Sequence, residues 1–227
     1  MKKIAVLLSG CGVYDGSEIH ESVFTLLALA KRDLETFCMA PDTEQHHVID
    51  HTKGEEMPEK RNVLKEAARI ARGDIRPLSE ITADDFDGLV IPGGFGAAKN
   101  LTKWAFSGPD GEIDFDVKRV ILQTKEANKP IAAMCMAPVV LAKAFAGSDT
   151  SAVLTVGTTE AKSPYDIAAI SQGMESLGAK AKMAGVEEAI VDAENKIVTT
   201  PCYMMDAPIT AVRNGIEKAI AQFEKFL

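Results

Sequence analysis

The stretch that decides the fold reads Pro130-Ile131-Ala132-Ala133-Met134-Cys135-Met136-Ala137-Pro138-Val139-Val140-Leu141-Ala142. Its first apolar run predicts a buried strand, and its second run predicts the opening of a helix. Cys135 therefore falls at a sharp strand-to-helix turn, which is the form of a nucleophile elbow. The helix end favours a thiolate over a thiol. The alternative is a cysteine that only fills the core, which is the commoner role of a lone cysteine.

The composition limits the class of protein. The chain has 227 residues, of which 46% are hydrophobic and 26% are charged, and this suits a single α/β domain over residues 1–227. A net charge of −8 argues against nucleic acid and membrane surfaces as partners. The first apolar run has only strand length, and the four cysteines are scattered, so the sequence predicts a cytoplasmic protein with reduced thiols.

Strand-like and helix-like runs alternate along the chain. Apolar runs predict strands at residues 4–8, 36–40, 86–91, 130–133, 152–156, 188–192 and 196–200. Capped helical patterns lie at residues 17–32, 63–72, 115–128, 165–177 and 206–226. This order predicts an α/β three-layer sandwich, in which a mostly parallel central sheet carries helices on both faces. The polar residues 42–61 predict a surface insertion.

The first predicted helix carries a carboxylate in an unusual position. Its main apolar stripe consists of Ile19, Val23, Leu26 and Ala30. Glu21 heads a second stripe with Phe24 and Ala28, so we expect it to be at least half buried. Burial raises the pKa of a carboxyl group, which suits a general acid or base. The alternative is an acid placed only to interact with the helix dipole. Glu18 is predicted to be solvated.

Two adjacent glycines follow the central predicted strand. In doubly wound sheets, functional groups gather at the C-terminal ends of the strands. Gly93 and Gly94 would let backbone N–H groups approach a reacting oxygen closely. Together with the N–H of Met136 they could form an oxyanion hole. Taken without the cysteine, a simple tight turn is the better interpretation of these glycines.

A glycine-rich loop after the first predicted strand suggests a competing function. It reads Gly10-Cys11-Gly12-Val13-Tyr14-Asp15-Gly16 and resembles a loosened dinucleotide-binding loop, with Asp42 at the end of the second predicted strand. The spacing departs from the strict pattern, and Asp15 and Glu18 would stand near a pyrophosphate. We therefore expect no such cofactor.

A cluster of histidines suggests a metal site. His46, His47 and His51 lie close in sequence, but they would share a face only on a helix. The polar stretch around them has no apolar period, so it predicts a solvated loop and no metal.

These residues together resemble the ThiJ/PfpI superfamily, which has a flavodoxin-like, class I glutamine-amidotransferase-like fold. The resemblance rests on the elbow at residues 132–138, the loop at residues 92–101 and the early Glu21, and it covers essentially the whole chain. Residues 9–21 and 196–204 are similar to the opening and closing signatures of the superfamily's ElbB-like branch.

The resemblance implies a role for each matching residue. Cys135 matches the nucleophile, and Glu21 matches the carboxyl group that hydrogen-bonds it and moves protons. Gly94 and Met136 match the backbone donors of the oxyanion site. Relatives with protease or hydrolase proposals carry a histidine soon after the elbow, and this chain has none there. A Cys-His triad of the usual layout, and with it peptidase activity, is therefore not expected.

The resemblance also implies an activity. Members of this branch suggest a cofactor-independent glyoxalase that converts small dicarbonyls such as glyoxal to the hydroxyacid through a Cys135 hemithioacetal. Gly93 and Asn100 are expected to line the substrate site. Repair of glycated protein side chains would use the same residues. A cysteine-based redox sensor or regulatory protein, and an accessory protein of isoprenoid biosynthesis, stay open as alternatives. The superfamily commonly forms homodimers, so we expect one here.

Overall fold

Seven strands form the central sheet. The computed structural model describes residues 1–227. The strands are β1 (Lys3–Leu7), β2 (Glu35–Ala40), β5 (Ile75–Pro77), β6 (Gly88–Ile91), β7 (Ile131–Met134), β10 (Ile190–Asp192) and β11 (Ile197–Thr200). Their order is β10-β11-β7-β6-β1-β2-β5, and only β10 runs antiparallel to its neighbour. The expectation of a mostly parallel sheet is confirmed.

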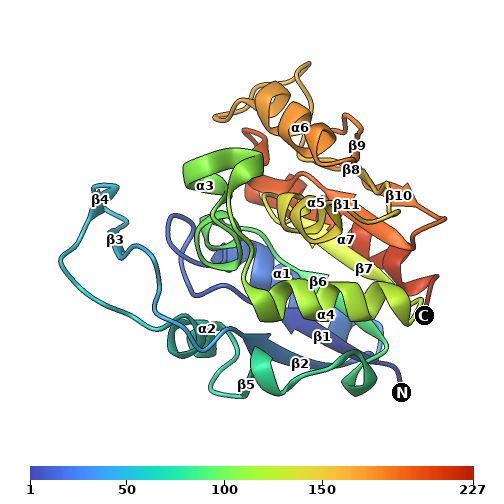
Figure 1. Ribbon diagram of the computed structural model, residues 1–227, viewed down its shortest axis with the longest axis horizontal. Coiled ribbons are helices and arrows are strands. Elements are labelled where there is room, and N and C mark those ends of the chain that lie inside the picture. Colours follow the sequence, from blue (N-terminus) through green and yellow to red (C-terminus); the bar gives the residue numbers. More distant parts are fainter.

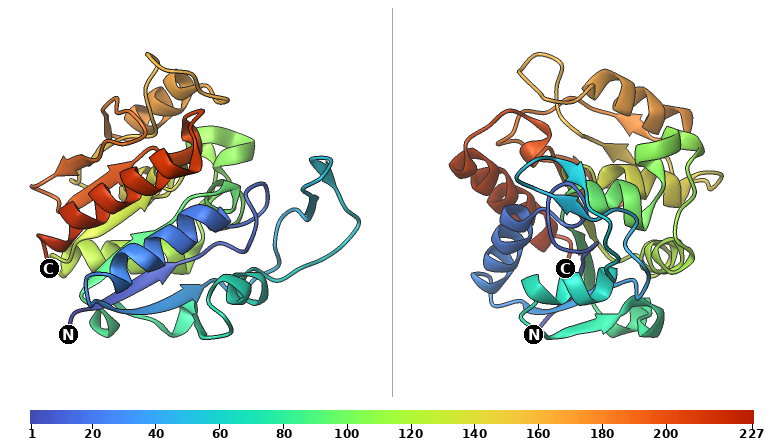
Figure 2. Two further views of the ribbon diagram at one scale, coloured as in Figure 1. Left: turned by 180° about the vertical axis from the view of Figure 1, so that it is seen from behind. Right: turned by 90° about the vertical axis from the view of Figure 1, so that its left-hand side faces the viewer.

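Helices cover both faces of this sheet. The helices α1 (Ile19–Ala30) and α7 (Ile209–Glu224) lie side by side on one face, and α4 (Phe115–Glu126) and α5 (Pro138–Phe145) cover the other (Figures 1 and 2). The helix α2 (Val63–Ile70) packs beside β2 and β5. The predicted three-layer α/β sandwich is therefore confirmed. None of the helices has both the length and the apolar character needed to cross a membrane.

Smaller elements lie around the sandwich. The helix α6 (Ile167–Ser176) packs with the two-stranded pair β8 (Val153–Leu154) and β9 (Lys180–Ala181), at the top of Figure 1. A four-residue helix, α3 (Trp104–Ser107), follows one π-helical turn at Ala97–Leu101. Short 3-10 turns lie at Leu78–Glu80, Ala83–Asp85, Gly108–Asp110 and Cys202–Met204.

The central strands are apolar throughout because both of their faces are covered. Ile4, Leu89 and Ile131, from β1, β6 and β7, have no exposed surface. A strand buried on both faces cannot alternate between polar and apolar residues without leaving polar groups in the core. The continuous apolar runs in the sequence therefore located these strands well.

The face of α1 that packs against the sheet is not its most apolar stripe. Ile19 and Val23 are 44% and 47% exposed. The buried face instead carries Glu21, Ser22, Thr25, Ala28 and Leu29. The prediction that Glu18 is solvated is wrong, because its carboxylate turns back to accept a hydrogen bond from the Glu21 N–H at 2.7 Å. This cap closes the N-terminus of α1 and buries the Glu18 side chain.

Residues 42–61 leave the body of the molecule as an extended segment that we call the arm. Its tip is a small hairpin of β3 (Ile49–Asp50) and β4 (Glu55–Glu56), seen at the left of Figure 1. The base of the arm is closed by a hydrogen bond from the Gln45 N–H to the Arg61 carbonyl, at 2.7 Å. The sequence predicted a loop here but not a hairpin, because two-residue strands leave no period to detect.

Candidate active site

Cys135 occupies the turn between β7 and α5. Its φ angle is +56°, a left-handed conformation that is uncommon for a residue with a Cβ atom. The Cys135 N–H donates to the carbonyl of Thr200 at 2.9 Å, which ties the turn to the end of β11. The side chain is 6% exposed. The strand-turn-helix arrangement predicted around this cysteine is present.

Three segments converge on this cysteine. Gly93 and Gly94 follow β6, Tyr203 follows β11, and Glu21 lies on α1, the helix that follows β1. All of them lie at the C-terminal ends of parallel strands. Ligand and catalytic sites of open α/β sheets form at this edge.

The Glu21 carboxyl is held in one orientation beside the thiol. Its side chain has no exposed surface. The Gly93 N–H donates to Oε2 at 3.1 Å, and the Tyr203 N–H donates to Oε1 at 3.2 Å. The carboxyl also shares a hydrogen bond with the Cys135 side chain. The structure thus brings Glu21 and Cys135 into direct contact, and the position of Glu21 is not explained by the helix dipole alone.

The environment of Glu21 changes its acidity. Burial raises the pKa of this carboxyl to about 8, and the nearby charge of Glu18 adds to the rise. The hydrogen bonds from Tyr203, Cys135 and Gly93 act in the opposite direction. A carboxyl with this pKa holds its proton through much of the neutral range and exchanges it readily, as a general acid or base must.

The thiol of Cys135 is also perturbed, but not in the direction that the helix end predicted. Burial raises its pKa well above the ordinary value, and the charge of Glu21 raises it further. Backbone hydrogen bonds from Gly94 and Met136 lower it only in part. The predicted preference for a resting thiolate is therefore wrong, because desolvation outweighs the helix end. At neutral pH the resting side chain is therefore a thiol.

The glycines allow backbone to approach the sulfur. A Cβ atom at Gly93 would overlap the Cβ of Cys135 and lie 2.5 Å from Oε2 of Glu21. Gly94 has a φ of +100°, and a Cβ there would overlap the backbone around Glu18. Close packing against Cys135 and Glu21 therefore explains the glycine at position 93, whereas Gly94 is explained by its positive φ and its packing against the first loop.

Substitution of Gly93 should be costly for the fold. We expect Gly93→Ala to lower the free energy of unfolding by about 1–3 kcal/mol, because the new methyl overlaps two side chains that cannot move apart. Gly185→Ala is the matched control, since its nearest neighbour would lie 3.4 Å away, at Glu188. Urea denaturation of both variants checks this. Equal stability of the two would contradict the packing described here.

The raised pKa of Glu21 makes a prediction about pH and stability. Because the folded-state pKa of about 8 exceeds the ordinary value of 4.5, the folded chain binds more protons than the unfolded chain between these values. Stability contributed by this group therefore falls as pH rises through that window. Glu21→Gln lacks the titration, so its stability relative to wild type should rise from pH 5 to pH 8. Urea denaturation at both pH values measures this, and a constant difference would contradict it.

Asn100 is the one predicted site residue that the structure does not bring to the cysteine. Its Nδ2 donates to the carbonyls of Ser9 and Asp15, both at 2.9 Å. Its Oδ1 accepts from the N–H of His46 at 3.0 Å. The amide is therefore used to tie the first loop to the arm, and the expectation that it lines the substrate site gains no support.

Several side chains near the candidate site were not among the predicted site residues. A pocket of about 440 Å³ at the mouth of the site is lined in part by Glu18, His20, Tyr165 and Tyr203. The Nδ1 atom of His20 lies 3.0 Å from the Tyr203 hydroxyl and 3.9 Å from Glu18. A histidine is thus present at the mouth, although none follows the elbow in sequence. Three of these four residues lie in the two signature stretches, residues 9–21 and 196–204. Those stretches were the feature of the sequence that could have identified them.

The glycine-rich first loop does not form a dinucleotide site. It closes on itself through a hydrogen bond from the Gly16 N–H to the Gly12 carbonyl, at 2.7 Å. The carboxylate of Glu18 already occupies the N-terminus of α1, where a pyrophosphate would have to bind. Asp15 is buried and accepts a hydrogen bond from the N–H of Ile49 in the arm. The loop therefore anchors the arm.

The histidines of the arm pack against aromatic rings. His46 lies 4.2 Å from the ring of Phe106 and 4.6 Å from His47, measured between ring centroids. His51 contacts Tyr14 and lies 3.8 Å from Asp15. The structure contains no group of three or more side chains placed to hold a metal ion.

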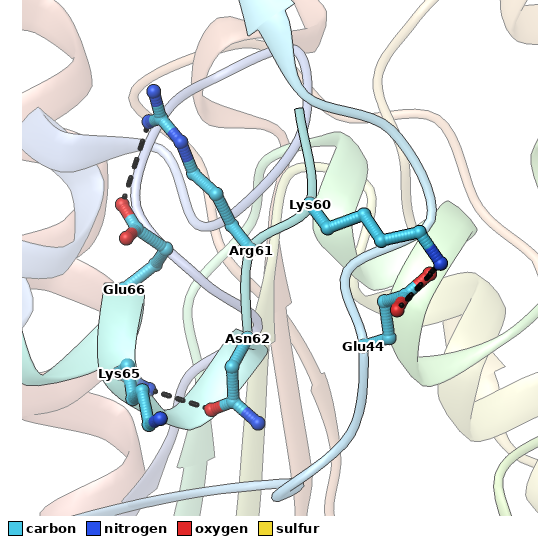
Figure 3. Close-up of a pocket in the computed structure, with 6 residues that line it drawn as sticks. All are labelled: Glu44, Lys60, Arg61, Asn62, Lys65 and Glu66. Atoms are coloured by element: carbon cyan, nitrogen blue, oxygen red, sulfur yellow. Dashed lines mark hydrogen bonds and ion pairs between the residues drawn. The ribbon is translucent and has the colours of Figure 1, made fainter. Parts of the chain in front are cut away.

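A second hollow, between the arm and α2, is polar, and four of its charged side chains form ion pairs. Figure 3 shows this pocket of about 420 Å³, which no hydrophobic residue lines. Lys60 pairs with Glu44 at 3.0 Å, and Arg61 pairs with Glu66 at 3.6 Å. These charges satisfy one another in solvent, and none of the lining residues contacts Cys135 or Glu21. The candidate site is therefore the elbow and not this pocket.

Comparison with known proteins agrees with this geometry. The model of the DJ-1/PfpI family matches residues 2–200. The chain belongs to the DJ-1/PfpI family. A solved structure titled isoprenoid biosynthesis protein with amidotransferase-like domain, from Ehrlichia chaffeensis, superposes with a TM-score of 0.89 at 32% identity, over 100% of this chain and 99% of that one. Drosophila melanogaster DJ-1beta has a TM-score of 0.52 at 16% identity, covers 99% and 95% of the two chains, and shows a shared fold only.

Curated relatives extend the family assignment. The ES1 protein homolog, mitochondrial, of Rattus norvegicus is 45% identical over 94% of this chain and 80% of its own length. The human glutamine amidotransferase-like class 1 domain-containing protein 3, mitochondrial, is 44% identical over 94% of this chain and 79% of its own length. Both names place those proteins in mitochondria and contradict the prediction of a cytoplasmic protein. Scattered free thiols indicate a reducing environment but do not identify the compartment, so they could not support a cytoplasmic location.

Proposed function

We propose that this DJ-1/PfpI family member is a cofactor-independent glyoxalase that converts glyoxal and similar small dicarbonyls to hydroxyacids. The observation that carries the proposal is the contact between the Cys135 thiol and the buried Glu21 carboxyl, with its pKa of about 8. The N–H groups of Gly94 and Met136 point at the same sulfur. The site thus combines a nucleophile, a proton carrier and an anion-stabilising pair.

The first step is attack of sulfur on an aldehyde carbon. Glu21 in its carboxylate form accepts the thiol proton as the C–S bond forms and the carbonyl π bond breaks. The raised pKa of Glu21 makes this transfer easier than it would be to an ordinary carboxylate, because the two groups are closer in acidity. The developing alkoxide receives hydrogen bonds from the Gly94 and Met136 N–H groups and then takes the proton back from Glu21, which returns to its carboxylate form. The product of this step is a hemithioacetal.

The second step moves one hydrogen between the two carbons. A carboxylate at Glu21 removes the proton from the hemithioacetal carbon, which gives an enediol, and returns a proton to the neighbouring carbon. The resulting thioester is hydrolysed by water, which releases glycolate and restores the Cys135 thiol. The balance is glyoxal plus water to glycolic acid, so one carbon is oxidised, the other is reduced, and no external oxidant is needed.

The reaction in heavy water tests this route. Proton NMR of glyoxal incubated with the protein in D₂O, without glutathione, should show glycolate that carries one deuterium on its methylene carbon. Exchange with solvent is expected because the proton passes through Glu21. Glycolate without deuterium would show a direct hydride shift and remove Glu21 from the role of proton carrier. Absence of glycolate would contradict the proposed activity altogether.

A redox role is the second candidate, and one contact favours it. A protonated Glu21 carboxyl beside the sulfur could donate a hydrogen bond to a sulfinate formed on Cys135. Peroxide titration with mass spectrometry of each cysteine separates the two candidates. Oxidation of Cys135 at lower peroxide than the half-buried Cys11 supports sensing. Oxidation of Cys11 first counts against it.

The names of the curated relatives support a mitochondrial setting for the activity. Repair of glycated protein side chains would use the same residues as glyoxal conversion. A homodimer stays a prediction, and the exposed residues Ile19, Val23 and Leu27 of α1 are the apolar surface to examine for it.

A further inference from the structure

A further pocket, different from the polar hollow beside α2, adjoins the candidate site and is much larger than glyoxal requires. It has a volume of about 530 Å³, and six of its eight lining residues are hydrophobic. We call it the arm pocket; its walls are formed mainly by Tyr14, Ile49, Phe95, Ala105, Phe106 and Tyr165. Lys99 is its one charged lining residue. Ligand sites commonly have this character, with apolar walls and a few polar groups.

The arm pocket adjoins the pocket at the mouth of the candidate site. Tyr14 and Tyr165 line both this pocket and the pocket at the mouth of the site. Phe95 directly follows Gly94, the residue whose N–H faces the sulfur. The rings of Phe95 and Tyr165 meet edge to face, with centroids 5.6 Å apart. A molecule bound covalently at Cys135 could therefore extend past these two rings into the arm pocket.

The arm builds one wall of this pocket. Ile49 belongs to its hairpin, and His46 and His47 pack on Phe106, with ring centroids 4.2 Å and 5.5 Å away. These contacts hold the Phe106 ring against the hollow. Aromatic and aliphatic walls on several sides suit a flat apolar group, since rings pack well edge to face and offset.

Lys99 has hydrogen-bonding capacity left for a ligand. Its ammonium group donates to the carbonyl of Tyr14 at 2.8 Å, which uses one of three donors. Asp15 and Glu56 are the acids that act on it electrostatically, and neither is a hydrogen-bond or ion-pair partner of Lys99. The carboxylate of Asp15 is already used by the Ile49 N–H. A ligand anion would therefore find an unpaired cation at the edge of an apolar pocket.

We propose that the arm pocket binds the substituent of the substrate, and that the preferred substrate class is an α-oxoaldehyde with an aryl group that ends in a carboxylate. This inference rests on the proposed glyoxalase function and names the substrate of that same site. The aldehyde carbon reacts with Cys135, the ring lies against Phe106, and the carboxylate meets Lys99. The balance is an arylglyoxal plus water to a mandelate, with the aldehyde carbon oxidised and the ketone carbon reduced.

Steady-state kinetics with three compounds tests the inference. We expect kcat/KM to rise from glyoxal to phenylglyoxal to 4-carboxyphenylglyoxal. Phe106→Ala should lower the preference for both aryl compounds over glyoxal by about tenfold. Lys99→Met should remove about a tenfold advantage of the carboxylated compound over phenylglyoxal. Phe115→Ala is the matched control, since this residue is 79% exposed at the start of α4 and should change none of these ratios.

Calorimetric binding of the product 4-carboxymandelate separates this inference from the proposed function. One outcome is that no dicarbonyl is turned over, while 4-carboxymandelate binds wild type and binds Phe106→Ala about tenfold more weakly. In that case the glyoxalase function fails, and the arm pocket is still supported as a binding site for carboxylated aryl groups. If glyoxal is turned over but the aryl compounds show no advantage and 4-carboxymandelate binds no better than glycolate, the substrate class is overturned. Equal preferences in wild type, Phe106→Ala and Lys99→Met would also overturn it.

Discussion

Replacing Cys135 with alanine should reduce kcat/KM for glyoxal by at least about 10³-fold, because the covalent route disappears with the sulfur. The fold should survive, since the methyl of alanine fits where the Cys135 Cβ already lies, and the N–H bond to the Thr200 carbonyl is kept. Glycolate formation measured by NMR, together with the circular dichroism of the variant, checks both statements.

The control for this experiment is Cys11→Ala. Cys11 is the half-buried cysteine of the first loop. In the structure it contacts neither Glu21 nor the turn at Cys135. It should keep wild-type turnover. If Cys135→Ala retained the rate of wild type, glyoxal conversion would not pass through this thiol, and the proposed mechanism would fail.

Replacing Glu21 with glutamine should lower kcat for glyoxal by about 10²–10⁴-fold, because proton transfer to and from the substrate loses its carrier. The variant also tests the direction of the pKa shift. The active pair needs Glu21 as carboxylate, so wild-type kcat/KM should rise about tenfold per pH unit below the pKa and level off above about pH 8. In Glu21→Gln the residual activity should not level off there.

The matched control is Glu35→Gln, at the exposed start of β2. This variant keeps the same chemical change but places it on the surface, so it should reproduce both the rate and the pH profile of wild type. A wild-type profile that levels off near pH 5 would mean that Glu21 titrates as an ordinary carboxyl. That result would remove the role assigned to its burial.

The fold was largely readable from the sequence, because buried parallel strands leave continuous apolar runs. The strands β1, β6 and β7 were located by such runs, and the elbow at Cys135 followed from the strand and helix patterns on either side of it. The hairpin of the arm was missed, since strands of two residues show no period. The burial of Glu18 was missed because a capping side chain folds back onto its own helix, and helical spacing does not show this.

The candidate site was readable only in part. Glu21 and Cys135 could be selected by residue type and position, but their mutual contact depends on how β1 and β7 are ordered in the sheet. The acidity of the thiol was predicted in the wrong direction, because a helix N-terminus is visible in the sequence and the extent of desolvation is not. Asn100 was selected because it lies in the same loop as Gly93 and Gly94. Its side-chain amide instead donates hydrogen bonds to the carbonyls of Ser9 and Asp15.

We propose that Cys135 and Glu21 form a coupled pair that passes one proton between them. The pH dependence of Cys135 alkylation by iodoacetamide, read by mass spectrometry of that peptide, measures this most directly in wild type and in Glu21→Gln. We expect a raised thiol pKa in wild type and a lower one in Glu21→Gln, because removal of the carboxylate charge favours the thiolate. Identical profiles in the two proteins, or an ordinary thiol pKa in both, would contradict it.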